Sequence, residues 1–251
     1  MLALVCLRGL DAESASLGQS PRSAPSAASA QSSPEPSASP YRVAPASADG
    51  IGKFYDGREI AQVMGFDGAP WLDRPSREHE ERPDLPVREM RLQPGMTVAD
   101  IGAGSGYLSR RMVPLVAPGK VFAVDVQPPM VALLAELSKQ PGMDNLVAVQ
   151  GAVDDVKLPA GSLDLAVMVD VYHELEFPLE VMRTVVRALK PGGRMVFVEY
   201  RAEDPKVPIK LLHKMSEAQV RLEMRRLPLD WERTDELLPV QHIVVFRKRQ
   251  L

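Results

Sequence analysis

The sequence predicts an α/β domain built on a doubly wound, mostly parallel sheet of seven strands, with an antiparallel strand pair near the C-terminus. Two observations support this prediction. Beyond residue 50, short runs rich in β-branched residues alternate with segments of helical periodicity, which is typical of βαβ units around a parallel sheet. These runs are also nearly continuous in apolar residues, as expected for strands that are buried on both faces.

The parallel part is expected to contain five strands: Thr97–Ile101, Lys120–Asp125, Leu146–Gln150, Leu163–Val169 and Arg194–Tyr200. Apolar residues at i, i+3, i+4 and i+7 indicate a helix after the second strand, which Pro128–Pro129 opens and Pro141–Gly142 stops. The same spacing indicates a helix before the fifth strand, with the apolar residues Met182, Val185, Val186 and Leu189.

The pattern changes after Tyr200. Ser216 and Gln219 have the spacing of a capping box, which predicts a helix through about Met224. Two further strands are expected at the sheet edge, as an antiparallel pair formed by Leu229–Thr234 and His242–Arg247.

Short amphipathic helices are expected before the sheet, at Gly57–Met64 and Ser76–Arg82, where they could cap its open end. The predicted organisation is therefore a helical cap over residues 51–92 and a main domain over residues 93–251. About 200 residues are enough for one sizeable domain with a cap.

The N-terminal part differs in composition. Residues 14–48 consist largely of Ser, Ala and Pro, so we expect residues 1–50 to be disordered. The apolar run over residues 1–7 is too short to span a membrane and lacks the basic start of a signal peptide. No integral membrane segment and a cytoplasmic location are expected. The alternative is an exported protein in which residues 1–50 are the remnant of a longer leader.

Charge and cysteine content exclude several classes of protein. With 251 residues, 25% of them charged, and a net charge of −3, the chain lacks the basic excess that nucleic-acid partners require, and none is expected. Cys6 is the only cysteine, which excludes an intrachain disulfide framework and a thiolate zinc cluster. The sequence leaves the oligomeric state open.

The strongest local signal is a glycine-rich turn after the first strand, which reads Val-Ala-Asp-Ile-Gly-Ala-Gly-Ser-Gly over residues 98–106. Glycines in such a turn allow a positive φ and a close approach of the backbone to a ligand. Dinucleotide enzymes use G-x-G-x-x-G instead, and Tyr107 stands where their third glycine would be. Asp100 before the turn would repel a pyrophosphate and suits a cationic or amino-bearing ligand. Asp125, at the end of the second strand, can accept hydrogen bonds from both ribose hydroxyls.

Over residues 85–200 the chain resembles the class I S-adenosylmethionine (SAM)-dependent methyltransferases, a family with a Rossmann-like fold, and its motifs are nearest to those of the ubiquinone/menaquinone C-methyltransferases. Four features carry the resemblance in the right order: the loop at Asp100–Gly106, Asp125, the run at Leu158–Asp164, and the run at Leu189–Arg194. The resemblance implies SAM as the cofactor.

The resemblance also implies roles for individual residues. The backbone of Gly102, Ala103, Gly104 and Gly106 would line the methionine moiety of SAM, and Asp100 would lie near its amino group. Asp125 would bind the ribose, and Val126 would pack against the adenine.

One position departs from the family pattern. After the third strand, related enzymes carry Gly-Asp-Ala, whose Asp contacts the adenine amino group, but this chain has Ala152 there. Asp154 or Asp155 could substitute from a shifted loop, and a backbone carbonyl is a further alternative. Of these, Asp154 is the one we expect.

The methyl acceptor should lie at the ends of the fourth and fifth strands. Asp170 and His173 are candidates for acceptor binding and general base, because an imidazole can accept a proton at neutral pH. Tyr172 could present its ring to the sulfonium or its hydroxyl to the substrate. The simpler alternative is a helix start, with Glu174 as a first-turn acid and His173 as an ordinary loop residue.

Polar residues also follow the fifth strand and could bind an anionic or polar acceptor: Glu199, Arg201, Glu203, Asp204, Lys210, His213 and Lys214. A divalent metal on Asp170, Glu203 or Asp204, and His213 would resemble catechol-type O-methyltransferases. The Asp-Asn pair of those enzymes is missing at the fifth strand, so no metal is expected. Trp71 with the charged run at residues 74–82 could form a lid, but a solvated charged helix is the role we expect.

The predicted function is methyl transfer from SAM to a small-molecule acceptor. Alternatives are a methyltransferase that acts on a protein or nucleic acid, and a SAM-binding protein without catalysis. The chain lacks a basic stripe with aromatic residues, and the residues from Asp170 to His173 do not form the Asn/Asp-Pro-Pro-Tyr motif of amide methylation. The spacing of the glycines argues against a nicotinamide-dependent oxidoreductase.

Overall fold

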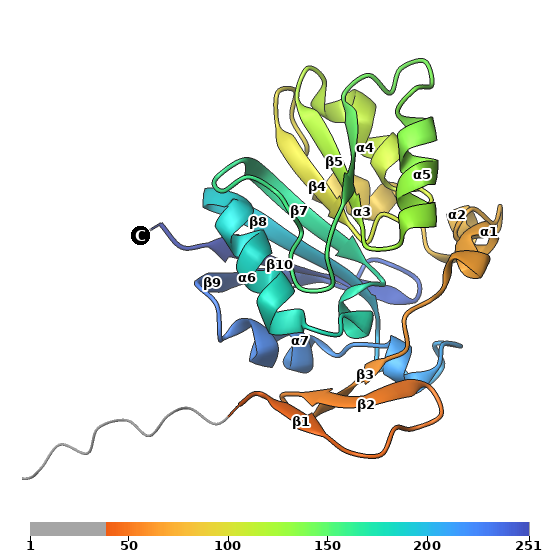
Figure 1. The fold of residues 1–251 in the computed structure, drawn as a ribbon, viewed down its shortest axis with the longest axis vertical. Helices are drawn as coiled ribbons and strands as arrows, with labels where there is room; N and C mark the ends of the chain where they lie inside the picture. The colour runs from red at the N-terminus through yellow and green to blue at the C-terminus, as the bar shows by residue number, and fades with distance from the viewer. Residues whose placement is uncertain (1–38, 251) are drawn as a thin grey trace, which may run out of the picture. The chain divides into compact units, whose positions relative to one another are not determined.

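Seven strands pair into one sheet in the order β6-β5-β4-β7-β8-β10-β9 within residues 39–250, the part of the chain that the computed structural model describes (Figure 1). Their bounds are β4 (Thr97–Ile101), β5 (Lys120–Asp125), β6 (Leu146–Gln150), β7 (Leu163–Val169), β8 (Leu189–Tyr200), β9 (Leu229–Asp235) and β10 (Gln241–Lys248). The first five run parallel, and β10 is antiparallel to both β8 and β9. The predicted sheet is confirmed, and β8 starts five residues earlier than expected.

The order of the strands reverses at β4, which pairs with β5 on one side and with β7 on the other. In an open parallel sheet, such a reversal leaves a crevice beyond the carboxyl ends of the two central strands. The glycine turn follows β4 directly, so it lies at this crevice.

Helices cover both faces of the sheet (Figure 1). One apolar cluster packs α4 (Ser109–Val116) and α5 (Pro128–Leu137) against one face, and a second cluster packs α6 (Pro178–Ala188) and α7 (Glu217–Met224) against the other. The helix α5 begins at Pro128 as predicted and ends four residues before the expected stop at Pro141. The Ser216 side chain accepts a hydrogen bond from the Gln219 backbone N–H at the start of α7, as the capping motif predicts.

Three short strands precede the sheet and form an antiparallel sheet of their own: β1 (Tyr41–Val43), β2 (Gly50–Tyr55) and β3 (Arg58–Ala61). The prediction of a helix at Gly57–Met64 is therefore wrong. Asp56 and Gly57 both have a positive φ and join β2 to β3 through a two-residue turn, which matches the right-handed twist of a hairpin. The strand β1 lies within residues 1–50, the segment expected to be disordered. Residues 1–38 of that segment are outside the part of the chain that the structure describes.

Helical turns follow the hairpin: η1 (Phe66–Gly68), α1 (Ala69–Leu72), α2 (Arg77–Glu80) and α3 (Asp84–Glu89). The helix α2 lies within the predicted Ser76–Arg82. The segment before the main sheet, expected as a helical cap, thus combines a small sheet with short helices. No helix within residues 39–250 has the length and apolar character needed to span a membrane.

The small sheet is attached to the helices of one face. The Tyr41 hydroxyl donates a hydrogen bond of 2.5 Å to Glu180 on α6. The Arg58 guanidinium forms a buried ion pair of 2.9 Å with Glu223 on α7 and donates to the carbonyl oxygen of His173 at 3.0 Å. These contacts hold β1–β3 beside the carboxyl end of β7.

Candidate functional site

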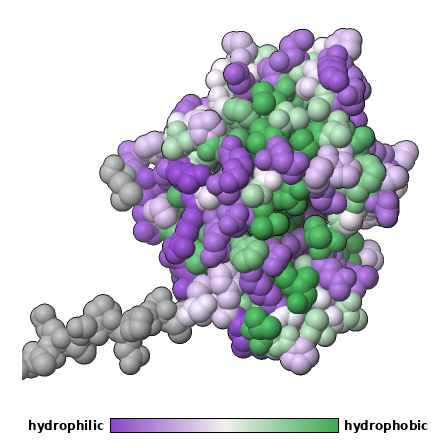
Figure 2. Space-filling view, viewed as in Figure 1, coloured by the Kyte–Doolittle hydropathy of each residue, from purple (hydrophilic) through white to green (hydrophobic). Residues whose placement is uncertain are grey.

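A cavity of about 720 Å³ lies beyond the carboxyl ends of the parallel strands. Its floor comes from the loops after β4, β5, β6 and β7, and its cover comes from the residues around β2 and β3, from α1, and from residues 208–213. Apolar residues gather across the middle of the molecular face shown in Figure 2. The cavity size is in the range of small-molecule sites.

The glycine turn forms one wall of this cavity. Gly102 and Gly104 both line it, with φ of 71° and 54°. A Cβ atom on Gly102 would lie 2.6 Å from the methyl groups of Val171, and one on Gly104 would lie 2.6 Å from Leu72. Because both positions lack space for a side chain and have a positive φ, only glycine fits there without strain.

Two of the turn residues that were expected to bind the methionine moiety do not reach the cavity. A Cβ atom on Gly106 would meet Leu137 of α5 at 2.5 Å, so this glycine permits close helix packing. Ala103 is buried and donates its backbone N–H to the carbonyl oxygen of Val124 at 3.0 Å. Neither residue lines the cavity, in contrast to the expected contact with the methionine moiety.

Asp125 lines the cavity at the end of β5. One carboxylate oxygen accepts the backbone N–H of Gly104 and the other accepts that of Gln127, both at 2.9 Å. Burial raises the pKa of Asp125, and these hydrogen bonds oppose the rise. Each oxygen retains a lone pair for a further donor. The carboxylate is thus held in place and can accept two hydroxyl groups.

Asp100 lies elsewhere than the sequence suggested. Its carboxylate is buried, accepts a hydrogen bond of 2.6 Å from the Ser109 hydroxyl, and does not line the cavity. Burial raises the pKa of Asp100 to about 6. Asp100 therefore ties β4 to α4 below the glycine turn, and the expected direct contact with a ligand amino group is not supported by this geometry.

The far end of the cavity is formed by Val126 and by the residues after β6. Val126 is 41% exposed and lines the cavity, as do Gly151, Ala152 and Val153. Asp154 is exposed and does not line the cavity, contrary to the expected contact with adenine.

The neighbouring acid, Asp155, does not replace Asp154 at the cavity. The carboxylate of Asp155 accepts the Lys157 backbone N–H and also pairs with the Lys157 and Arg187 side chains. Of the alternatives that the sequence left open, a backbone group in residues 151–153 fits the geometry best.

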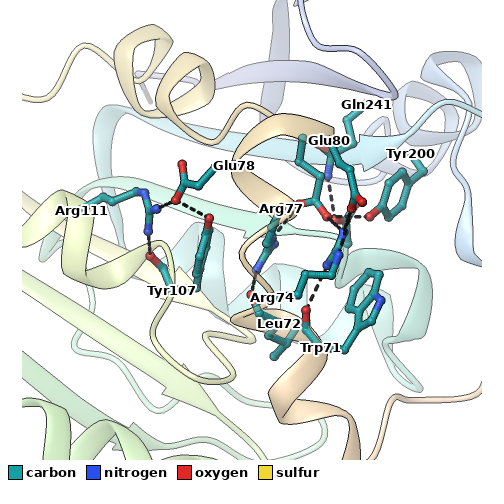
Figure 3. A network of polar contacts seen from close by, with 12 residues as sticks. Trp71, Leu72, Arg74, Arg77, Glu78, Glu80, Tyr107, Arg111, Tyr200 and Gln241 are labelled. Atoms are coloured by element: carbon teal, nitrogen blue, oxygen red, sulfur yellow. Dashed lines mark hydrogen bonds and ion pairs between the residues drawn. The ribbon is translucent and has the colours of Figure 1, made fainter.

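The segment of α1 and α2 packs against the glycine turn, where Leu72 lies close to Gly104. Figure 3 shows the polar contacts that hold this segment beside Tyr107 and Arg111. Arg77 donates to the Leu72 carbonyl oxygen at 2.9 Å and to Glu81 at 2.7 Å, and its guanidinium lies 4.4 Å from the centre of the Tyr107 ring. The Tyr107 hydroxyl donates to Glu78 at 2.6 Å. These contacts place Leu72 over Gly104, so the segment covers the cavity rather than standing free in solvent.

Asp170 follows β7 and lines the cavity with a φ of 54°. One carboxylate oxygen accepts a hydrogen bond of 2.7 Å from Gln241, and the other is buried without a hydrogen-bond partner among residues 39–250. Burial, with the nearby charges of Glu81 and Glu199, raises the pKa of Asp170 well above its usual value. An unpaired buried carboxylate oxygen is costly unless a ligand donates to it.

His173 lies in the turn η2 (Tyr172–Glu174) and lines the cavity. Its Nδ1 atom is 2.6 Å from Oε2 of Glu199, whose other oxygen accepts the Tyr172 backbone N–H at 2.9 Å. Because a carboxylate only accepts, Nδ1 carries the hydrogen and Nε2 has the lone pair. Glu199 therefore orients His173, whereas the side-chain hydrogen bond of Asp170 is with Gln241.

Tyr172 does not belong to the cavity, so its predicted role at the acceptor is corrected. Its side chain is fully buried, its hydroxyl donates to Glu223 at 2.6 Å, and its ring packs edge-on against Phe197 with the ring centres 5.0 Å apart. Adjacent side chains in a tight turn point in different directions, so Tyr172 faces the core while His173 faces the cavity.

Two residues join His173 at this end. His213, in the turn η3 (Leu211–His213), has its Nδ1 atom 3.3 Å from Nε2 of His173 and 3.3 Å from Oε1 of Glu174. Sequence reasoning treated Glu174 as a first-turn acid and Glu199 as one of several polar residues. The sequence signal that could have placed both residues in the site was their position near the carboxyl ends of the neighbouring strands β7 and β8.

The other polar residues after β8 have structural roles. Glu203 accepts the Glu217 backbone N–H at the start of α7, and Asp204 accepts that of Lys206. Lys214 is buried and donates to the Val207 carbonyl oxygen. The metal-ligand set considered from the sequence, which joined Asp170 and His213 to one of these acids, is not assembled.

Comparison with known proteins finds methyltransferases among the proteins similar in sequence and among those similar in fold. Residues 99–197 match the profile of a family described as a methyltransferase domain. An uncharacterized methyltransferase, YcgJ of Bacillus subtilis, is 30% identical over 109 residues, which cover 43% of this chain and 42% of that protein. The ubiquinone/menaquinone biosynthesis C-methyltransferase UbiE of Ectopseudomonas mendocina is 27% identical over 111 residues, or 43% of each chain. The chain thus matches less than half the length of these curated relatives.

Solved structures extend the likeness over more of the chain. A SAM-dependent methyltransferase from Aquifex aeolicus has a TM-score of 0.69 and 26% identity, covering 74% of this chain and 99% of that one. The structure of YcgJ has a TM-score of 0.55 and 16% identity, covering 67% and 98%, and shows likeness of fold alone.

Proposed function

This chain contains a class I SAM-dependent methyltransferase domain, and we propose that it transfers the methyl group of SAM to a small molecule bound beside His173. One observation carries the proposal. A single cavity joins the backbone of Gly102 and Gly104 and the carboxylate of Asp125 at one end to the imidazole of His173 at the other. A donor and an acceptor held in one enclosed space can be aligned for direct transfer.

The residues of the cofactor end fit SAM. The backbone of Gly102 and Gly104 borders the cavity where the methionine moiety would lie, and the two lone pairs of Asp125 suit the two ribose hydroxyls. Asp170 lines the same cavity and has one buried carboxylate oxygen without a donor among residues 39–250, so it is the candidate partner of the ammonium group. Val126 would pack against the adenine ring.

The acceptor end favours a small and largely apolar molecule. The cap contributes Ile51, Val63 and Met64, and the segment before η3 contributes Pro208 and Ile209. Because these residues cover the cavity, a macromolecular acceptor has less access than a small one. The relatives named as a quinone C-methyltransferase and, in Xanthomonas campestris, as a ubiquinone biosynthesis O-methyltransferase also support a small acceptor.

SAM supplies an electrophilic methyl group when it is bound. The protein must then orient the acceptor and receive its proton, if the attacking atom carries one. Nε2 of His173, whose contact with Nδ1 of His213 is long at 3.3 Å, has the lone pair for this proton, and Glu199 would stabilise the imidazolium that forms. The fixed tautomer of His173 is the structural basis for this role.

Two measurements test the proposal. Binding of S-adenosylhomocysteine to the full chain is expected by calorimetry, with Asp125→Ala weaker. A set of phenols, quinols and small thiols incubated with methyl-labelled SAM should then give labelled product and S-adenosylhomocysteine. Failure to bind either SAM or S-adenosylhomocysteine would overturn the proposed function.

A further inference from the structure

We infer that His173, Glu174 and His213 form a binding site for a divalent transition-metal ion, of which Zn²⁺ is the representative. Among residues 39–250 these three side chains are grouped so that one donor atom of each lies within 4.8 Å of the others. Two imidazoles and one carboxylate are a ligand set that suits zinc, iron and related ions.

The spacing of the donor atoms fits an ion. Nδ1 of His213 is 3.3 Å from Nε2 of His173 and 3.3 Å from Oε1 of Glu174, and the third edge of the triangle is 3.8 Å. A triangle with these edges has its centre about 2.0 Å from each corner, close to the Zn–N and Zn–O bond lengths of about 2.0–2.2 Å. An ion therefore fits among the three atoms without displacing them.

Hydrogen bonds on the far side of two ligands hold the donor atoms in position. Glu199 binds Nδ1 of His173, which leaves the lone pair on Nε2 for an ion. The Met64 backbone N–H donates to Oε2 of Glu174 at 3.2 Å and leaves Oε1 directed at the two histidines. A carboxylate behind a ligating histidine is the usual support of a protein-bound metal, because it fixes the tautomer and raises the basicity of the ring.

The local charges also favour a cation. Glu199 is fully buried and the Glu174 side chain is only 13% exposed, so the His173 ring lies between two carboxylates that have little solvent around them. The nearby Arg58 is already paired with Glu223. A dication would offset the negative charge of both acids. Without an ion, the two histidines can share only a single hydrogen bond of 3.3 Å.

All three ligands line the cavity, so an ion held by them would have its remaining coordination positions open to the acceptor end. Three protein ligands with an open position are the pattern of catalytic rather than structural zinc. This step rests on the proposed function: the ion would bind an oxygen or sulfur of the acceptor and lower its pKa. With the ion bound, the lone pair of Nε2 would coordinate the ion. His173 would then accept a proton from the acceptor only in the metal-free protein.

The test is a titration of the full chain, freed of metal by a chelator, with Zn²⁺ in the absence of SAM and acceptor. One ion per chain is expected to bind, with a rise in melting temperature. His213→Ala and Glu174→Gln should each weaken binding at least ~10-fold. His79→Ala, which replaces an exposed histidine outside the cavity, is the matched control and should bind as the parent does. Co²⁺ should show the absorption of a low-coordinate nitrogen and oxygen site.

Three results would overturn the inference: no binding, equal affinity in His213→Ala and in the parent, or loss of binding in Cys6→Ser. Because His213 lies at the cavity wall in a short turn, its replacement should leave the melting temperature of the metal-free protein within a few degrees, and this is checked first. Since the titration contains no cofactor, its failure leaves the proposed methyl transfer standing, and a failed methyl transfer leaves the metal site standing.

Discussion

Nδ1 of His173 lies 2.6 Å from Oε2 of Glu199, and both side chains are almost completely buried. His173 lies in the turn after β7, and Glu199 lies near the end of the neighbouring parallel strand β8. This contact fixes which nitrogen of His173 carries the hydrogen, and with it the direction in which the free lone pair points. A buried polar pair of this kind at the wall of a cavity is typical of a functional site.

Replacement of His173 should impair catalysis and spare cofactor binding. In His173→Gln, turnover is expected to fall roughly 10²–10⁴-fold, because proton transfer by a positioned base contributes about this factor. The affinity for S-adenosylhomocysteine should stay within about twofold by calorimetry. A variant that loses cofactor affinity in parallel with turnover would place His173 at the cofactor end instead.

Glu199→Gln should reduce turnover while His173 remains present. The amide cannot balance the charge of an imidazolium, and the lost charge-assisted hydrogen bond is worth about 1.5–3 kcal/mol, or roughly 10–100-fold in rate. Steady-state kinetics with an acceptor found in the screen with methyl-labelled SAM would measure the effect. Glu136→Gln, an exposed residue of α5, is the matched control and should behave as the parent does. Equal rates in the two variants would remove Glu199 from the mechanism.

Asp125→Ala should weaken SAM binding about 10–100-fold, since it removes the acceptor of the ribose hydroxyls. The loss is measured by titration calorimetry at fixed ionic strength. Asp144→Ala, at an exposed acid outside the cavity, serves as the control and should leave the affinity unchanged. Unchanged affinity in Asp125→Ala would mean that the ribose is bound by other groups.

Gly104→Ala should weaken SAM binding, because the new methyl group would meet Leu72 at 2.6 Å and displace α1. Gly161→Ala is a close control: its φ of 61° is similar to the 54° of Gly104, but no atom lies within 4 Å of the added Cβ. Both variants should lose some stability from the positive φ. Only Gly104→Ala should lose cofactor affinity, and an equal loss in both would mean that the close contact is unimportant.

The stability of the protein should carry a pH-dependent contribution from Asp100. Burial raises the pKa of Asp100 in the folded state from 3.8 to about 6, so the folded state binds more protons than the unfolded state between these values. The free energy of unfolding should therefore fall as the pH rises from about 4 to about 6, and the contribution lost is on the order of 3 kcal/mol.

Asp100→Asn should remove this contribution, because the amide stays neutral and can still accept from Ser109. Urea unfolding of both proteins at pH 4.5 and pH 7 gives the comparison. The Asn variant should gain stability relative to the parent as the pH rises. Parallel pH profiles would show that Asp100 ionises normally in the folded protein.

The main sheet could be predicted from the sequence because its strands are buried on both faces and therefore form continuous apolar runs. Four of them, β4 to β7, have the predicted bounds. The hairpin of β2 and β3 was missed because β3 has only four residues, and Ile60 has helical spacing with Val63 and Met64, which lie just beyond the strand. The Asp56-Gly57 turn was the better signal, since it favours a two-residue hairpin.

The site was predictable only where a residue lies at or shortly after the carboxyl end of a strand. Gly102 follows β4, Asp125 ends β5, and His173 lies in the turn after β7, and all three line the cavity. The approach of His213 to Glu174 depends on how the segment after β8 folds back, which no local pattern encodes. The orientation of Tyr172 toward the core likewise follows from tertiary packing.

The cap around β2 and β3 has an evolutionary consequence. Its Arg58 contacts the backbone of His173, and its Ile51 and Met64 line the cavity, yet all three lie outside the stretch that matches the methyltransferase family. The segment before His213 lies outside it too. Under the proposed function, selection could therefore change the acceptor by altering these flanking segments while residues 99–197 are kept. A match over residues 99–197 alone then carries no information about the acceptor.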